Sequence, residues 1–391
     1  MTNLAEAVAS LTPALVETRH HLHQHPELSG QEAETARLVA GRLSALGLDV
    51  RTGVGGHGVI ATLRGAHPGP MLALRADMDA LPIREQSQVS YRSQNEGVMH
   101  ACGHDGHTAV LLGVAHVLAT RQEQIAGTVR FLFQPAEELG LGAKDMIAAG
   151  AMEGVDAAVA LHAWPALPVS QIGVRMGAMT ASADTLEIVI HGKGAHAAYP
   201  HLSADPVIAA AQTILALQTL ASREVDPVQP VVVSVTQMTA GTAPNIIPET
   251  VRLAGTIRAH SYEVRAALPA QIRRLCEGIC VAHRCRCEVT VQDGILPVIN
   301  DPAIASLIAE AAGETLGREN VIALPAASMG AEDFASYLAL APGALFRLGL
   351  GDPTPLHAPT FDFPDAALPV GVSVMATFAL KFLGGRWIRG S

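Results

Sequence analysis

The sequence is poor in aromatic residues and cysteines and carries no excess of positive charge. Aromatic residues make up only 4% of its 391 residues, so its core must rest on alanine and the aliphatic side chains. A net charge of -10 argues against nucleic acids and membrane surfaces as partners, and favours a small soluble substrate. No uninterrupted apolar run reaches the ~18 residues of a membrane span, and no basic region followed by an apolar stretch marks a signal peptide. We therefore expect a cytoplasmic protein with reduced cysteines.

Four of the five cysteines, Cys276, Cys280, Cys285 and Cys287, lie within a short segment. Their C-x3-C and C-x-C spacings differ from the usual C-x2-C pairs of structural zinc sites. Packing is the favoured interpretation, with Cys276 and Cys280 on one face of a helix and Cys285 and Cys287 on one face of the next strand.

A chain of this length exceeds the usual size of a single core, so two domains are expected. Apolar runs at 71–74, 128–133 and 157–161 alternate with helical patterns, which predicts parallel strands buried on both faces in an α/β sheet flanked by helices. Sites of such sheets lie at the carboxyl ends of the strands. That edge would collect the polar residues Asp79, Cys102, His104, Glu137, Glu138 and His162.

The pattern changes at about residue 181. Residues 181–293 read as β-α-β-β-α-β, the order of a ferredoxin-like α+β unit. We predict that they form a domain inserted into a catalytic domain made of residues 1–180 and 294–391. Gly53–Gly58 matches a dinucleotide-binding spacing, but a β-branched segment follows it instead of a helix, so a hairpin is expected there.

Metal-binding residue types are densest in residues 99–107, which hold Cys102, His104 and two further histidines beside two glycines. In an extended segment Cys102 and His104 would point to the same side and could meet one ion. An amphipathic helix is predicted over 105–121, so Asp105 could be its N-cap or a functional residue. The histidines at 20, 21, 23 and 25 lie on a predicted helix, where consecutive side chains diverge and do not converge on one ion.

Six motifs, in order and spanning nearly the whole chain, resemble one group of proteins. They lie at 75–82, 100–107, 134–138, 162–165, 241–248 and 356–359. Together they closely resemble the aminoacylase and carboxypeptidase-G superfamily of metal-dependent hydrolases, in the branch of hippurate hydrolases and auxin-amino acid conjugate hydrolases.

The resemblance implies a mostly parallel α/β catalytic domain with an inserted ferredoxin-like dimerisation (lid) domain. It implies two divalent metal ions, zinc, manganese or cobalt, held by Cys102, His104, Glu138, His162 and His357. Glu137 would be the general base and Asp79 would orient an imidazole. Glu137 and Glu138 are adjacent, so we do not expect both to face the same ion. The wider superfamily usually has a bridging aspartate, and a histidine two residues before the equivalent of Asp79. Here Asp77 occupies that position and Cys102 supplies a thiolate, which leaves the bridging ligand and the identity of the metal open.

The resemblance also implies a homodimer, or a dimer of dimers, formed through the inserted domain. His196 would reach the partner's site and stabilise an oxyanion, Arg258 would grip a substrate carboxylate, and Asn245 would contact substrate. Glu332 and Asp333 match a further family segment near the site.

The expected reaction is hydrolysis of an N-acyl amino acid amide, hippurate-like or N-acetyl, to a carboxylic acid and a free amino acid. A dipeptidase or carboxypeptidase with the same site, a non-catalytic metal-binding homologue, and a hydrolase with Cys102 as nucleophile are the alternatives.

Overall fold

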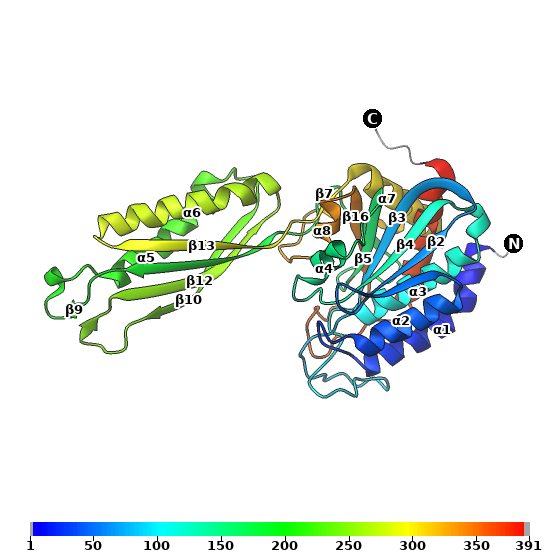
Figure 1. Ribbon diagram of the computed structural model, residues 1–391, viewed down its shortest axis with the longest axis horizontal. Helices are drawn as coiled ribbons and strands as arrows, with labels where there is room; N and C mark the ends of the chain where they lie inside the picture. Colours follow the sequence, from blue (N-terminus) through cyan, green and yellow to red (C-terminus); the bar gives the residue numbers. More distant parts are fainter. Residues whose placement is uncertain (1–2, 387–391) are drawn as a thin grey trace. The chain divides into compact units, whose positions relative to one another are not determined.

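The computed structural model describes residues 3–386, which fold as two compact units (Figure 1). The large unit contains the chain up to Gly177, then Asn300–Ala326, and the chain from Asp333 onward. The inserted unit contains Ala178–Ile299 and Ala327–Glu332. Short strands β7 (Gly177–Ala178) and β14 (Ile299–Asn300) pair where the chain passes from one unit to the other.

The large unit is built on one mixed sheet in the order β1-β2-β4-β3-β5-β16-β6-β15. Its central strands β4, β3, β5 and β16 are mutually parallel, which confirms the three predicted parallel strands. Antiparallel pairs lie outside them: β1 with β2 as the predicted hairpin, β2 with β4, and β16 with β6. The strands are β1 (Asp49–Val54), β2 (Gly58–Arg64), β3 (His67–Asp77), β4 (Ala126–Gln134), β5 (Ala157–Trp164), β6 (Ile172–Val174), β15 (Val321–Ala323) and β16 (Gly343–Gly349).

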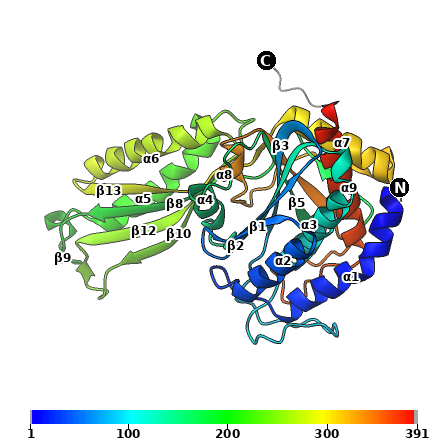
Figure 2. The ribbon, with the colours of Figure 1, turned by 45° about the vertical axis from the view of Figure 1, so that its right-hand side comes forward.

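Helices pack around this sheet and around one another (Figures 1 and 2). They are α1 (Leu4–Gln24), α2 (Ala33–Ala45), α3 (His104–Ala119), α4 (Gly142–Ala148), α7 (Pro302–Leu316), α8 (Ala335–Leu338) and α9 (Ala367–Lys381). Helix α3 was predicted to be amphipathic, but it is buried along almost its whole length, because α1, α9 and β3 all pack against it. A side chain at Gly113 would lie 2.7 Å from Val372 of α9 and 2.9 Å from Leu15 of α1, so the three helices meet closely at this glycine.

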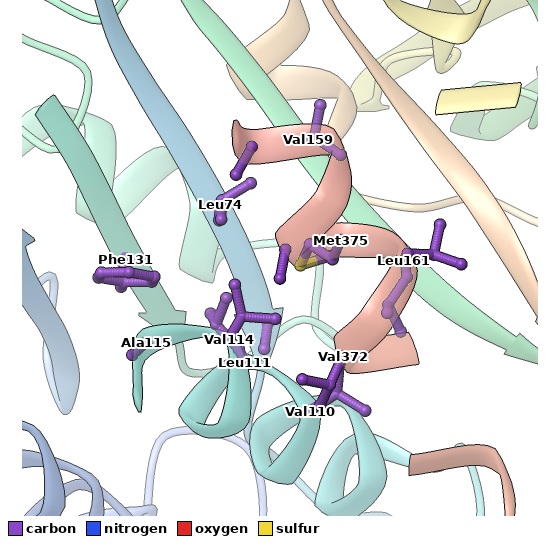
Figure 3. Close-up of a cluster of buried hydrophobic side chains, with 14 of the residues drawn as sticks. Leu74, Val110, Leu111, Val114, Ala115, Phe131, Val159, Leu161, Val372 and Met375 are labelled. Carbon is purple, nitrogen blue, oxygen red and sulfur yellow. The ribbon is translucent and has the colours of Figure 1, made fainter. Parts of the chain in front are cut away.

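The apolar faces of these elements form a single large core. Figure 3 shows Leu111 and Val114 of α3 in the same cluster as Leu74 of β3, with Met375 of α9 near them. In the described chain, one segment, Ala367–Gly384, is long and apolar enough to cross a membrane, and 61% of it is buried in the core. Its composition is therefore accounted for by packing.

The inserted unit has the predicted ferredoxin-like order of elements. These are β8 (Ala183–His191), α5 (Pro206–Thr219), β10 (Val231–Ala240), β12 (Thr250–Ala259), α6 (Tyr262–Ala282) and β13 (Arg286–Ile295). The strands form an antiparallel sheet in the order β10-β12-β8-β13, and the two helices pack on it (Figure 1). Strands β9 (Ala195–His196) and β11 (Ile246–Ile247) form a separate small pair.

The four clustered cysteines lie largely as predicted. Cys276 and Cys280 are buried on α6, and Cys287 is on β13. Cys285 lies just before that strand instead of on it, because the helix ends in a turn at Arg284, whose φ is 60°.

Candidate active site

The site begins at the N-terminus of α3. The helix starts at His104, one residue earlier than predicted, and its N-cap is Gly103 in a left-handed conformation with φ 85°. Cys102 therefore lies in a turn before the helix and not in an extended segment. The turn still brings the thiol toward the imidazoles: ligand atoms of Cys102, His104 and His162 lie within 4.8 Å of one another, and the Cys102 Sγ is 3.5 Å from the His162 Nε2.

Hydrogen bonds leave the Nε2 atom of each of these imidazoles directed at the site. The Nδ1 of His104 lies 2.9 Å from the carbonyl oxygen of Asp79 and 3.1 Å from its Oδ1, so it must carry the proton. The Nδ1 of His162 likewise donates to the Ala163 carbonyl at 2.8 Å. The Nε2 of His104 is buried and has no hydrogen-bond partner in the described chain. A nitrogen oriented in this way is suited to bind a metal ion.

Charges around the two imidazoles shift their pKa values in opposite directions. Burial lowers the pKa of His104, but Asp77, Cys102 and Asp79 together raise it well above the usual value. Burial, His107 and Arg347 hold the pKa of His162 well below the usual value, so this ring is neutral at pH 7. Burial raises the pKa of the Cys102 thiol to about 12. Binding of a metal would therefore displace protons from Cys102 and His104.

Asp77 and His107 are hydrogen-bonded to each other next to the candidate ligands. The Nδ1 of His107 donates to the Asp77 Oδ1 at 2.6 Å, and its Nε2 accepts the Ala163 N–H at 2.8 Å, so both ring nitrogens are occupied. The second Asp77 oxygen accepts from the Arg75 Nη1 at 2.7 Å. His107 thus holds the backbone beside His162 and is not placed as a ligand.

Arg75 extends this support to residues far away in the sequence. Its guanidinium donates to the Gln134 Oε1 and to the Asp333 Oδ1, both at 2.9 Å. Asp333 in turn accepts the Ala143 N–H at 3.0 Å. These buried polar side chains join β3 to β4 and to the segment after Glu138. In the sequence, an arginine at the end of an apolar strand indicates a buried polar contact. It does not identify Gln134 and Asp333 as the partners.

Two adjacent carboxylates follow β4. Ala136 has a left-handed φ of 52°, and the Glu138 N–H donates to the Asp79 Oδ2 at 3.0 Å. One oxygen each of Glu137 and Glu138 lies within 4.8 Å of a His104 nitrogen and of the other. The two adjacent carboxylates therefore approach the same imidazole, and the expectation that they do not both face one ion stays a prediction.

Glu138 has the surroundings of a ligand. Its Oε1 is buried without a hydrogen-bond partner among the described residues, 3.4 Å from the Nε2 of His357 and 4.0 Å from the Nε2 of His104. His357 has a φ of 66°, and its N–H donates to the Ala101 carbonyl at 2.8 Å, beside Cys102. The Glu137 Oε1 instead lies 3.5 Å from the Asp333 N–H.

Asp105 and His23 of α1 belong to a buried network of charged side chains. Asp105 is not an N-cap: its Oδ2 accepts from the Arg19 Nε at 3.1 Å and from the His23 Nδ1 at 2.9 Å. The Nε2 of His23 donates to the Glu85 Oε1 at 3.2 Å. These two carboxylates raise the pKa of His23 to about 9, against the lowering by burial. His21 and His25, four residues apart, do approach each other, with ring centroids 4.7 Å apart.

The inserted unit carries the remaining predicted residues at opposite ends. His196 and Asn245 are exposed neighbours, since β9 pairs with β11 and the Ala197 N–H donates to the Asn245 carbonyl at 2.9 Å. The Ala198 N–H donates to the His196 Nδ1 at 3.1 Å, so the proton of the neutral ring lies on the exposed Nε2. Arg258 is half-buried on β12, eight positions after Thr250, the first residue of that strand. At ~3.3 Å per residue, the segment from Thr250 to Arg258 is about 26 Å long.

The large unit therefore brings all five predicted ligands and Glu137 together at one edge of its sheet. Two buried atoms without hydrogen-bond partners, the His104 Nε2 and the Glu138 Oε1, fit bound metal, as does the mixed set of thiol, imidazole and carboxylate donors. This fold and site define a metal-dependent hydrolase. The chain belongs to peptidase family M20/M25/M40, whose family profile matches residues 73–381.

Relatives of known description support this assignment. The chain is 41% identical over 375 residues to N-acetylcysteine deacetylase of Bacillus subtilis, covering 94% of this chain and 97% of that one. It is 38% identical over 388 residues to thermostable carboxypeptidase 2 of Saccharolobus solfataricus, covering 97% and 98%. The crystal structure of the Bacillus subtilis YxeP protein, described as a dinuclear metal-binding peptidase of the M20 family, has a TM-score of 0.88 and 37% identity, covering 96% and 99%.

Proposed function

We propose that this enzyme hydrolyses the amide bond of N-acyl amino acids and releases a carboxylic acid and a free amino acid. The observation that carries the proposal is the convergence of the five candidate ligands beside Glu137 at one sheet edge. The relation to an N-acetylcysteine deacetylase supports an acylated amino acid as the substrate class.

Cys102, His104, Glu138, His162 and His357 would hold two divalent ions, for which we propose zinc, manganese or cobalt. When bound, such a pair supplies Lewis acidity toward the amide carbonyl and makes water more acidic. Thiolate and imidazole favour zinc, whereas carboxylate also suits manganese. Asp79 holds a proton on the Nδ1 of His104, so the Nε2 is the nitrogen that would bind an ion once its own proton is displaced.

Glu137 is the proposed general base. It would take the proton from the attacking water and deliver it to the leaving nitrogen. Glu138 is engaged with Asp79 through its backbone and directs a buried oxygen at two imidazoles, which leaves the neighbouring carboxylate for proton transfer.

Arg258 and His196 would act on the substrate from different chains. Arg258 lies near the end of the inserted unit through which the chain enters, since the Ser182 N–H donates to the Ala259 carbonyl at 2.8 Å. His196 and Asn245 lie at the other end of β12. The strand segment from Thr250 to Arg258 alone is about 26 Å long, which is longer than one N-acyl amino acid. We therefore propose that Arg258 grips the substrate carboxylate in its own chain and that His196 donates its Nε2–H to the oxyanion in the partner's site.

This arrangement requires a homodimer formed through the inserted unit. Strand β10 is an edge of the inserted sheet, and its second half is exposed. Three large apolar side chains on β10 and α5 are exposed as well: Met238 at 46%, Ile208 at 49% and Leu215 at 71%. An unpaired edge beside exposed apolar residues is the kind of surface that pairs with a second copy. A dimer of dimers and a cytoplasmic location stay predictions.

The test combines a substrate panel with matched variants. N-acetyl, N-benzoyl and long-chain N-acyl amino acids should be hydrolysed faster than dipeptides with a free amine, in the presence of zinc, manganese or cobalt. Preference for the dipeptides would instead support the carboxypeptidase or dipeptidase alternative, which the archaeal relative also favours.

Glu137→Gln should retain its metal and lose turnover by about 10²- to 10⁴-fold, because the amide keeps the shape but takes no proton. The matched variant Glu138→Gln should lose metal. If Glu137→Gln lost the metal instead, the two roles would be exchanged. If full activity remained after exhaustive chelation, with no metal left by elemental analysis, the thiol of Cys102 would be favoured as nucleophile. If the protein bound metal but hydrolysed no substrate of the panel, it would be the non-catalytic homologue.

A further inference from the structure

A buried carboxylate outside the proposed ligand set contacts the segment that carries Glu137. Glu32 immediately precedes α2 and is fully buried. Its Oε1 accepts two backbone hydrogen bonds at 2.8 Å, one from the Gly30 N–H and one from the Ala136 N–H. Glu32 therefore joins the start of α2 to a residue that lies far away in the sequence and directly before Glu137.

Ala136 is the residue in this segment that needs external support. Its φ of 52° lies in the left-handed region, which a residue with a Cβ rarely adopts. Such conformations persist only where the surrounding structure holds them. The carbonyl of Ala136 is also used, since it accepts the Gly142 N–H at 3.2 Å.

Glu137 lies between two backbone N–H groups that are each held by a buried carboxylate. Before it, Glu32 binds the Ala136 N–H, and after it, the Asp79 Oδ2 binds the Glu138 N–H at 3.0 Å. Asp79 is further fixed by the Ser29 hydroxyl at 2.7 Å. The backbone on both sides of Glu137 is thus held by contacts from two different segments.

We propose that Glu32 is a positioning residue for Glu137, which it directs into the site by holding Ala136 in its left-handed conformation. The inference rests on the proposed function, because that function makes Glu137 the base. The length of the Glu32 side chain matters for this role, and its charge does not. The Oε1 accepts both hydrogen bonds, and the Oε2 of Glu32 has no partner among the described residues. Burial raises the pKa of Glu32, which agrees with a role that needs only an acceptor.

Two variants separate reach from charge. Glu32→Gln keeps the length and an acceptor oxygen, so it should keep most of the turnover. Glu32→Asp keeps the charge but is one methylene shorter, so it should lose up to about 10²-fold in kcat, the effect of a displacement of about 1 Å at a reacting group. KM and metal content should change little in either variant. The acid limb of the kcat/KM pH profile, which reports the base, should move in Glu32→Asp only.

Glu27→Ala is the matched control on the same helix start. The Glu27 carboxylate accepts the N–H groups of Glu34 and Thr35 in the first turn of α2, at 3.1 and 2.8 Å. Its removal should lower the thermal midpoint and leave kcat and the pH profile unchanged. An equal loss of kcat in Glu27→Ala would mean that helix stability and not the Ala136 contact is at work, and would overturn the inference.

The remaining outcomes are equally decisive. Wild-type kcat in Glu32→Asp, a greater loss in Glu32→Gln than in Glu32→Asp, or loss of metal from Glu32→Asp would each overturn the positioning role. Glu137→Gln, assayed in parallel, separates this inference from the proposed function. Full turnover in Glu137→Gln refutes the proposed base, whereas loss of turnover in Glu137→Gln with wild-type kcat in Glu32→Asp refutes only the role of Glu32.

Discussion

Asp79→Asn is the substitution whose effect the geometry predicts most sharply. The Asp79 carboxylate accepts from three donors: His104 on Oδ1, and the Ser29 hydroxyl and Glu138 N–H on Oδ2. Burial opposes its ionisation, but these donors hold the pKa of Asp79 below its usual range. An asparagine offers one acceptor oxygen and an NH₂ group in place of the two oxygens.

The backbone donor decides how the asparagine amide must lie. The hydroxyl of Ser29 can rotate, but the Glu138 N–H cannot, so the amide oxygen should stay beside Glu138 and the NH₂ should face the His104 Nδ1. The backbone carbonyl of Asp79 still accepts the Nδ1 proton at 2.9 Å, but the NH₂ group now repels that proton and turns the ring away, so the Nε2 is less well directed at metal. Loss of such an orienting partner typically costs about 10- to 100-fold in metal affinity, or about 1.4 to 2.7 kcal/mol at about 1.4 kcal/mol per tenfold change.

The assay is metal affinity by competition with a chelator, with turnover at saturating metal as the second measurement. Ser29→Ala is the control, because it removes one donor to Asp79 and leaves the His104 contact in place. It should change metal affinity far less than Asp79→Asn does. Wild-type metal affinity in Asp79→Asn would refute the reasoning, because it would show that the backbone carbonyl of Asp79 alone orients His104.

Three further predictions follow from protonation and assembly. Metal affinity should rise with pH, by up to about tenfold per pH unit for each proton displaced from Cys102 and His104. Calorimetry in buffers of different ionisation enthalpy measures the number of protons released on metal binding. A pH-independent metal affinity would contradict the prediction. The pKa of His23 is raised from 6.5 to about 9, so its contribution to stability, roughly 3 kcal/mol, should be present in full below about pH 6.5 and lost as pH rises through about 9. Urea unfolding should therefore show a steeper loss of stability between these pH values in the wild type than in His23→Gln, and parallel curves would contradict the ion pairs with Asp105 and Glu85. Mixing inactive His196→Ala and Glu137→Gln chains should restore activity, because one site of each mixed dimer combines an intact base with an intact oxyanion donor. Loss of that donor lowers turnover by about 10²- to 10³-fold. No recovery after verified subunit exchange would place His196 in its own chain's site.

Hydrophobic pattern was sufficient to predict the scaffold. Apolar runs that end in polar residues predicted parallel strands with the site at their carboxyl ends, and β3, β4 and β5 bring Asp79, Glu137 and His162 to one edge. The β-α-β-β-α-β order of the inserted unit could also be predicted, because each element carries its own periodicity. Both results depend on local sequence, which determines which face of an element is buried.

The polar contacts that hold the site could not be predicted in the same way. The sequence left Asp105 open between an N-cap and a functional residue, and did not indicate that a buried arginine from α1 binds it. The contact of Arg75 with Asp333 joins residues that no local pattern relates. The left-handed Ala136 has no sequence signal at all, because alanine is not a residue that favours this conformation.

The five proposed ligands come from four separate segments of the large unit: the turn before α3 together with its first residue, the end of β4, β5, and the loop that holds His357. An ion held by all of them would act as a cross-link between parts of the chain that are brought together only by complete folding. It would bind the folded and not the unfolded chain, and free metal at about 100 times its dissociation constant would add about 2.7 kcal/mol to the free energy of unfolding. Metal supply would then govern how much enzyme survives proteolysis as well as how fast each molecule works, since degradation follows the population of the unfolded state.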